Sequence, residues 1–191
     1  MANAFKRIIP DPYIRFVISF VILYLLLNYF NVFYIGVTAK GGLYSSFLDE
    51  HLNYIKWWRT FLLESAAKTL RWLNYTVITN ETDLLVIGKG AIRLIYTCLG
   101  YGIMSVFAAF CITYPSPFKY RFGFMLAGLI SIQILNIGRF ILLPLYWDRK
   151  HPLFGMDHHD LFNIVIYILL IGICYLWIRY STKAKNAKNR A

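Results

Sequence analysis

The chain has 191 residues, of which 59% are hydrophobic and 18% aromatic, and its formal net charge is +11. This is more apolar surface than one soluble core needs, so the composition excludes an ordinary soluble domain and indicates a polytopic membrane protein. The positive charge does not indicate nucleic-acid binding, because the sequence shows no such module and aromatic residues inside apolar helices are not stacking platforms.

Four apolar runs are long enough to cross the hydrocarbon layer, which takes about 20 helical residues. They cover residues 16–37, 94–118, 122–147 and 161–178, and a charge, Arg139, interrupts the third run. A cleaved signal peptide is the alternative for the first run, but its length favours a retained helix. We therefore predict an all-α polytopic protein with four spanning helices.

Lysine and arginine gather in three flanks of these predicted spans, and this sets the expected orientation. Cytoplasmic flanks of membrane proteins collect basic residues. The basic residues of the three flanks are Lys6, Arg7, Arg15, Lys119, Arg121, Arg179, Lys183, Lys185, Lys188 and Arg190. We therefore expect both termini in the cytoplasm and the segment 38–93 on the outer face.

The segment between the first two spans is predicted to hold an amphipathic helix and a hairpin. Residues 57–75 place apolar side chains near one face, and four charges interrupt the run. This pattern favours a helix lying in the outer membrane interface over a fifth span. Two β-rich runs flank Gly88-Lys89-Gly90, which predicts a short outer β-hairpin leading into the second span.

Three chemically capable groups fall at one membrane face in this topology. Cys98 lies at the outer start of the second span, Arg139 within about two turns of the outer end of the third, and His158 and His159 at the outer start of the fourth. A thiol in a first helical turn feels the positive end of the helix dipole, which favours the thiolate. The structural alternatives are a buried thiol, a snorkelling arginine and histidines that only begin a helix.

A polar stripe runs along the third predicted span. Gln133, Asn136 and Arg139 are spaced by three residues, so they share one helix face, which we expect to turn inward from lipid. A transporter would use such a stripe as a polar path. We expect no metal and no cofactor, because the adjacent His158 and His159 cannot easily both face one ion from a helix. A cysteine with a histidine as its base is the simpler arrangement.

The other two cysteines are not expected to join Cys98. Cys111 lies 13 residues further along the same predicted helix, or about 20 Å away, and Cys174 falls near the inner end of the last span. These separations predict that the chain has no structural disulfide.

The order of these motifs resembles the exosortase and archaeosortase family. The motifs are "TCLGYG" at Cys98, "NIGRF" at Arg139 and "DHHDLFN" at the histidines, and the resemblance is strongest over residues 75–180 of a single domain, 1–191. Members are polytopic prokaryotic membrane proteins considered to be cysteine transpeptidases. They process proteins whose C-terminal anchor consists of a short motif, an apolar helix and a basic tail. The chain looks like a compact form, since many members carry more helices and place Ser-Gly, rather than Leu-Gly, after the cysteine.

The resemblance implies a catalytic set of Cys98, Arg139 and one histidine. His159 is favoured over His158, because members tend to place a small or polar residue four positions later, where Asn163 stands. The implied partners are membrane-anchored substrate proteins and the lipid bilayer, and the implied location is a prokaryotic cell membrane with the active site on the outer face. A thioacyl-enzyme would form during cleavage. A non-enzymatic scaffold, a transporter and a cysteine acyltransferase are the alternative functions.

Overall fold

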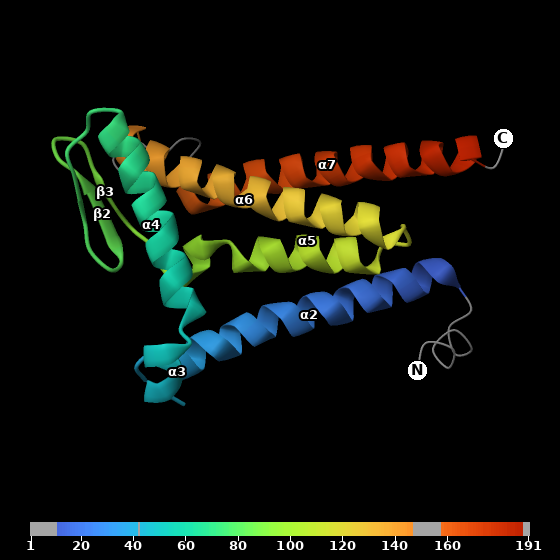
Figure 1. Ribbon diagram of the computed structural model, residues 1–191, viewed down its shortest axis with the longest axis horizontal. Coiled ribbons are helices and arrows are strands. Elements are labelled where there is room, and N and C mark those ends of the chain that lie inside the picture. The colour runs from blue at the N-terminus through green and yellow to red at the C-terminus, as the bar shows by residue number, and fades with distance from the viewer. Residues whose placement is uncertain (1–10, 42, 147–157, 189–191) are drawn as a thin grey trace.

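The computed structural model of the chain describes residues 11–41, 43–146 and 158–188, and within the last range it describes side chains at 162–179. In this part of the chain, four helical segments are long and apolar enough to cross a membrane. They are α2 (Pro12–Thr38), the 3₁₀ turn η1 (Tyr96–Leu99) with α5 (Tyr101–Thr113), α6 (Phe118–Tyr146), and α7 (His158–Lys188). The four run side by side in alternating directions (Figure 1). The prediction of a mostly helical protein with four spans is confirmed.

The first and last described helices meet the same end of this bundle (Figure 1). α2 begins there, α7 ends there, and the connection between α5 and α6 lies there as well. Arg15 and Arg121 stand near the first turns of α2 and α6, and Arg179 ends the apolar stretch of α7 toward this side. Basic residues that flank three spans therefore gather on one side of the bundle, as is typical of a cytoplasmic side.

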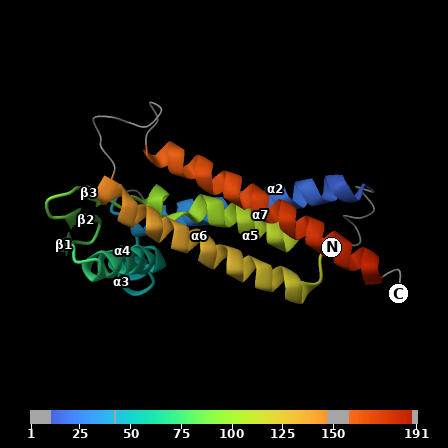
Figure 2. The same cartoon turned by 90° about the horizontal axis from the view of Figure 1, so that it is seen from above.

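The segment between α2 and η1, residues 43–95, folds at the opposite end, and we call it the cap. Its helices are α3 (Ser46–His51) and α4 (Tyr54–Trp72), and its strands are β1 (Val77–Thr79), β2 (Asp83–Val86) and β3 (Ala91–Arg93). The strands form an antiparallel sheet in the order β1-β2-β3. The predicted hairpin is β2–β3, and β1 adds a third strand that the sequence analysis missed. α4 crosses the cap ends of the spanning helices in Figure 1 and lies beside the cap end of α6 in Figure 2.

α4 is the predicted amphipathic helix, and protein covers its apolar face. Its buried residues are Ile55, Leu62, Leu63, Ala66, Ala67 and Leu70. They share one core cluster with residues of β1, β2, η1 and α6. An amphipathic pattern shows that one helix face is buried but not what buries it. Trp57, Phe61 and Trp72 remain exposed, and such aromatic residues suit the membrane interface to which the sequence assigned this helix.

The turn between β2 and β3 packs directly on the end of α6. A Cβ atom on Gly90 would lie 2.9 Å from the carbonyl oxygen of Pro144 in α6, so a side chain there would push the turn away from the helix. Gly88 has φ +76°, a left-handed conformation that glycine adopts without strain. Gly88 thus permits the bend of the predicted turn, and Gly90 permits the contact of the turn with α6.

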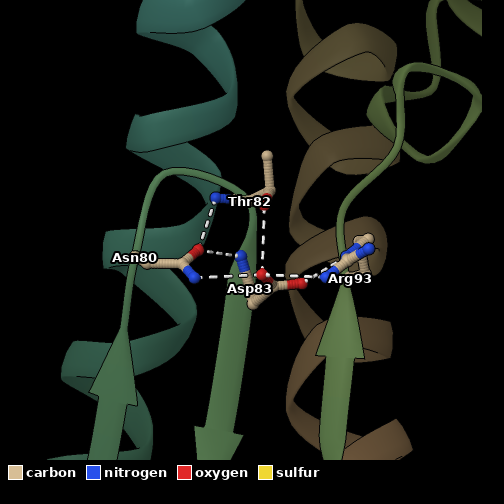
Figure 3. Close-up of polar contacts among 4 residues, drawn as sticks. All are labelled: Asn80, Thr82, Asp83 and Arg93. Atoms are coloured by element: carbon tan, nitrogen blue, oxygen red, sulfur yellow. Dashed lines mark hydrogen bonds and ion pairs between the residues drawn. The ribbon is translucent and has the colours of Figure 1, made fainter.

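A network of polar side chains ties the strands of the cap together (Figure 3). Arg93 on β3 donates from Nε to Asp83 Oδ1 on β2 at 2.7 Å. Asn80 donates to Asp83 Oδ2 at 3.0 Å and accepts hydrogen bonds from the backbone N–H groups of Thr82 and Asp83. The hydrogen bonds from Arg93 and Asn80 lower the pKa of Asp83 from 3.8 to about 2.

We expect this network to make the cap less stable at low pH. The folded state favours ionised Asp83, so its contribution is complete above about pH 4 and is lost as the pH falls from about 4 to about 2. Limited digestion with pepsin across this range should show wild-type cleavage in residues 76–93 rising as the pH falls. The Asp83→Asn variant should be cleaved there already at pH 4. Equal cleavage of both proteins at pH 4 would contradict the prediction.

α5 and α6 approach each other closely in the middle of the bundle. A Cβ atom on Gly128 of α6 would overlap the ring of the fully buried Phe107 of α5. Small residues at helix contacts permit such close packing within membranes. Phe107 shares its apolar cluster with buried Cys111, and Cys174 of α7 packs against this cluster. The three cysteines, all within the described residues, form no disulfide with one another.

Candidate active site

The backbone places Cys98 just before the helix in which it was expected. It lies in η1, where its N–H donates to the carbonyl of Ile95 at 2.9 Å, and α5 begins three residues later. Between the two, Gly100 has φ +79°. The sequence analysis had placed the thiol in the first turn of an α-helix. The proposed effect of the helix dipole on the thiol therefore loses its structural basis, because the dipole belongs to the helix that starts at Tyr101.

Arg139 of α6 contacts the thiol of Cys98 inside the protein. Its Nη2 donates to Cys98 Sγ at 3.8 Å, and the two residues are 5% and 3% exposed. The guanidinium carbon lies 4.9 Å from the centre of the Phe162 ring on α7 and 5.8 Å from that of Phe140. Such cation–π contacts stabilise a charge that is removed from water. Arg139 therefore does not snorkel to the membrane surface.

The polar stripe on α6 turns inward and holds the Cys98 segment in place. Asn136 Nδ2 donates to the carbonyl of Cys98 at 2.9 Å, and Gln133 Nε2 donates to the carbonyl of Leu99 at 3.3 Å. Gln133, Asn136 and Arg139 are all buried. The expectation that the stripe faces the protein is confirmed. The stripe donates its hydrogen bonds to the Cys98 segment. The transporter interpretation therefore loses the polar path on which it depended.

Gly100 allows the chain to pass this stripe. A Cβ atom at Gly100 would lie 3.5 Å from Gln133 Nε2 and 3.6 Å from Asn136 Nδ2, which is ordinary contact, but the left-handed backbone disfavours any side chain. Gly100 thus separates η1 from α5 and lets both carbonyls of the turn face α6. Gly100 is the glycine that directly follows Leu99 in the motif "TCLGYG".

We expect Gly100→Ala to cost about 1–2 kcal/mol of stability, because alanine is strained in a left-handed conformation. Gly102 provides the matched control: it lies in α5 without a positive φ, and the nearest atom to a Cβ there is 3.9 Å away. Gly102→Ala should therefore be neutral or stabilising. Thermal unfolding of both variants in the same detergent measures the difference, and equal midpoints would contradict this account of Gly100.

The chain also matches a known protein family over the region that contains this contact. A family model described as transmembrane exosortase matches residues 42–176, which is more than half of the chain and includes Cys98 and Arg139. The chain belongs to the transmembrane exosortase family. The resemblance in the sequence is thereby confirmed. Searches of the curated proteins and of the solved structures found no match.

The family match covers most of the described elements. It begins in the connection that leads into the cap and ends within α7, so it includes the cap, η1, α5 and α6. The cap therefore lies within the matched region. Members of the family are generally transpeptidases that act on proteins with sorting signals.

The histidines of this exosortase open α7, the helix that reaches Arg139 through Phe162. Positions 158 and 159 precede Phe162 by four and three residues, spacings that share one side of an α-helix. The side chains of His158 and His159, and all of Asp157, lie outside the part of the chain that the structure describes. The assignment of a catalytic histidine therefore stays a prediction. Among the described residues, no cluster of three or more His, Cys, Asp or Glu could hold a metal ion.

Proposed function

We propose that this exosortase is a membrane-embedded cysteine peptidase or transpeptidase with Cys98 as its nucleophile. The observation that carries the proposal is the buried contact between Arg139 Nη2 and Cys98 Sγ at 3.8 Å. A permanently charged guanidinium beside a thiol, in a region of low dielectric constant, is suited to stabilise a thiolate or a developing oxyanion. A scaffold would need neither the thiol nor the charge.

In the first half of the reaction, His159, or His158 in the alternative assignment, takes the proton from Cys98. The thiolate attacks the carbonyl carbon of the scissile peptide bond, and the carbonyl oxygen becomes an oxyanion that Arg139 stabilises. When the C–N bond breaks, the leaving amine takes the proton from the histidine and departs with the anchor. A thioester between Cys98 and the substrate remains.

In the second half, an acceptor amine or water attacks the thioester carbonyl. The histidine takes a proton from this nucleophile and returns it to the departing thiolate, which restores the enzyme. An amine completes transpeptidation and water completes hydrolysis. Asn136 acts as a positioning residue, because it fixes the carbonyl of Cys98 and thereby the turn that carries the sulfur.

An apolar hollow of about 140 Å³ supports a substrate with a membrane anchor. It lies between α5, α6 and α7, and its lining includes Phe107, Gly128, Leu135 and Ile166. Leu135 and Ile166 each stand four residues, or about one turn, from Arg139 and Phe162 along their helices. The hollow therefore begins about one turn from the candidate site, where side chains of an apolar anchor helix would pack.

The proposed orientation places both termini in the cytoplasm and the candidate site on the outer face of a prokaryotic cell membrane. The orientation is supported by Arg15 and Arg121 near the first turns of α2 and α6, and by Arg179 at the end of the apolar stretch of α7, all toward the end opposite the cap. The substrates in this proposal are exported proteins that end in a short motif, an apolar helix and a basic tail.

A covalent adduct on Cys98 would test the proposal directly. A reporter protein with such a C-terminal anchor is co-expressed with the exosortase, and the purified enzyme is analysed by mass spectrometry without reducing agent. We expect a hydroxylamine-sensitive acyl adduct on the peptide that contains Cys98 and none on the peptide with Cys111. A reporter that is cleaved while Cys98 never carries an acyl group would overturn the assignment of the nucleophile.

A further inference from the structure

The outer edge of β3 carries backbone groups that face away from the sheet. Val86 N–H donates to the carbonyl of Gly90 at 2.9 Å, and Leu94 N–H donates to the carbonyl of Thr82 at 2.7 Å. Hydrogen bonds to one neighbouring strand recur at every second residue, so positions 90, 92 and 94 face β2. The backbone groups of the alternate positions, 91, 93 and 95, therefore point to the other side.

These outward groups belong to Ala91, Arg93 and Ile95. Among the described residues, no backbone hydrogen bond involves the N–H groups of these three or the carbonyls of Ala91 and Arg93. All three residues are exposed. In Figure 3, β3 forms the side of the sheet away from β1, and the described sheet has no strand beyond it. An edge of this kind pairs readily with another extended chain.

The charge on β3 is held away from this open edge. Charged side chains on an edge strand commonly discourage pairing with another chain. Arg93 is the charged residue of β3, and its Nε donates to Asp83 Oδ1 on β2 at 2.7 Å (Figure 3). The guanidinium is thus drawn toward β2 and leaves the outward backbone groups accessible.

The open edge leads directly into the turn that carries the candidate nucleophile. Ile95 is the last edge residue, and its carbonyl accepts a hydrogen bond from the N–H of Cys98 at 2.9 Å. The other edge of the sheet belongs to β1, two strand spacings or roughly 10 Å further away. There, Thr79 donates to Glu64 of α4 at 3.3 Å. Of the two edges, that of β3 is therefore the one continuous with the candidate site.

We propose that the open edge of β3 binds the substrate segment preceding the membrane anchor as a fourth strand of the cap sheet. The inference rests on the proposed function of Cys98 and states how the same site holds its substrate. The outward backbone groups of Ala91, Arg93 and Ile95 bond to the substrate backbone, so this contact does not depend on the identity of the substrate side chains.

The direction of the added strand follows from the two chains. From β3 the enzyme continues through η1 into the spanning helix α5. The substrate likewise continues from its extended segment into its anchor helix. Both chains therefore run from the outer side into the membrane, and the added strand is parallel to β3.

A second copy of this chain is the competing occupant, because open edges also pair with one another. The shortness of β3, with three residues, favours the substrate. So short an edge offers few bonds to hold a dimer together. A substrate whose anchor already lies in the membrane beside the enzyme needs little further affinity, because tethering raises its effective concentration.

Proline at an outward position tests the edge. Ala91→Pro removes an outward N–H and no hydrogen bond to β2. We expect it to lower the rate of cleavage of the anchored reporter about tenfold, as for the loss of one backbone hydrogen bond. Ala91→Val keeps the N–H and should cleave at the wild-type rate. Thr79→Pro makes the matched change on the outer edge of β1 and should stay within twofold of wild type.

Hydrogen exchange tests the same edge in a protein whose sheet is unaltered. The Cys98→Ala enzyme keeps the reporter intact, and residue-resolved mass spectrometry follows the amides. Positions 93 and 95 should exchange rapidly in the enzyme alone and at least tenfold more slowly with the anchored reporter. A reporter without its anchor should not slow them at the same concentration. Positions 92 and 94, which bond to β2, serve as the internal reference.

A proline scan of the reporter adds a signature of strand pairing. Proline removes an N–H, and in a strand only every second N–H faces a given partner. Strong and weak losses of cleavage should therefore alternate along the segment that precedes the anchor. An alanine scan of the same positions keeps every N–H and controls for contacts of the side chains. Losses without alternation would contradict the added strand.

The outcomes separate this inference from the proposed function. If Cys98 acquires the acyl adduct while the reporter leaves exchange at positions 93 and 95 unchanged, the added strand is refuted and Cys98 stands as the nucleophile. If the reporter slows this exchange but Cys98 never carries an acyl group, the edge stands and the proposed function fails. Slow exchange without reporter would overturn the proposal: in a monomer it assigns the edge to the enzyme's own chain, and only in a dimer to a second copy.

Discussion

Replacement of Cys98 by alanine should abolish processing of an anchored substrate, whereas Cys111→Ala and Cys174→Ala should leave it near the wild-type level. Only Cys98 contacts the guanidinium of Arg139, and the other two cysteines pack in the separate apolar cluster around Phe107. Without the sulfur no thioester can form, so residual cleavage should fall to background. Gel shift of a co-expressed reporter, with and without its C-terminal anchor, measures the cleavage.

Cys111→Ala is a well-matched control, because both thiols are buried and both substitutions remove one sulfur from an apolar core. The two variants should therefore lose similar, modest amounts of stability. Comparable expression and unfolding midpoints, together with opposite effects on cleavage, would assign the loss to chemistry. Full activity of Cys98→Ala would remove the peptidase interpretation and favour a scaffold.

Arg139→Lys should retain the positive charge and lose most of the rate. The guanidinium presents several donors in a fixed plane, and its Nη2 is the donor that reaches Cys98. An ammonium group on a flexible chain cannot reproduce this arrangement, so we expect the cleavage rate to fall roughly a hundredfold, as for the loss of one oxyanion contact. Single-turnover cleavage in the same membranes measures the rate independently of expression.

Arg121→Lys is the control for this substitution. Arg121 lies near the other end of α6, far along this helix from Arg139. Its Nη1 donates to the carbonyl of Ile112 at 2.8 Å. Its replacement should leave the cleavage rate within a fewfold of the wild type. Equal rates for Arg139→Lys and wild type would exclude the catalytic assignment and leave Arg139 as a structural residue.

The four spans and the inward polar stripe could be predicted because each depends on a strong local signal. Apolar length alone identified the spanning helices, and the three-residue spacing of Gln133, Asn136 and Arg139 placed them on one face. A charged side chain is energetically unfavourable in lipid, so Arg139 within an apolar run is expected to turn into the protein. The amphipathic helix and the hairpin turn were also visible in the local pattern.

What could not be predicted depends on contacts between distant segments. Nothing local shows that α4 packs on a sheet and on α6, or that a three-residue strand such as β1 pairs with β2. The 3₁₀ turn that carries Cys98 ends at Gly100, whose left-handed conformation became visible only in the structure. The buried donors of Arg59 and Tyr101 that lack an acceptor among the described residues were equally invisible, because burial is defined only once the fold has been built.

The shared core around Cys98 has a consequence for the biogenesis of the protein. This cluster combines residues of α4, β2 and η1 with Phe140 of α6, which is synthesised about forty residues after Cys98. A nascent chain that ends after α5 holds the thiol without Phe140 and without Arg139 of α6. The candidate site is therefore completed only when α6 has entered the membrane and has packed against the cap and η1.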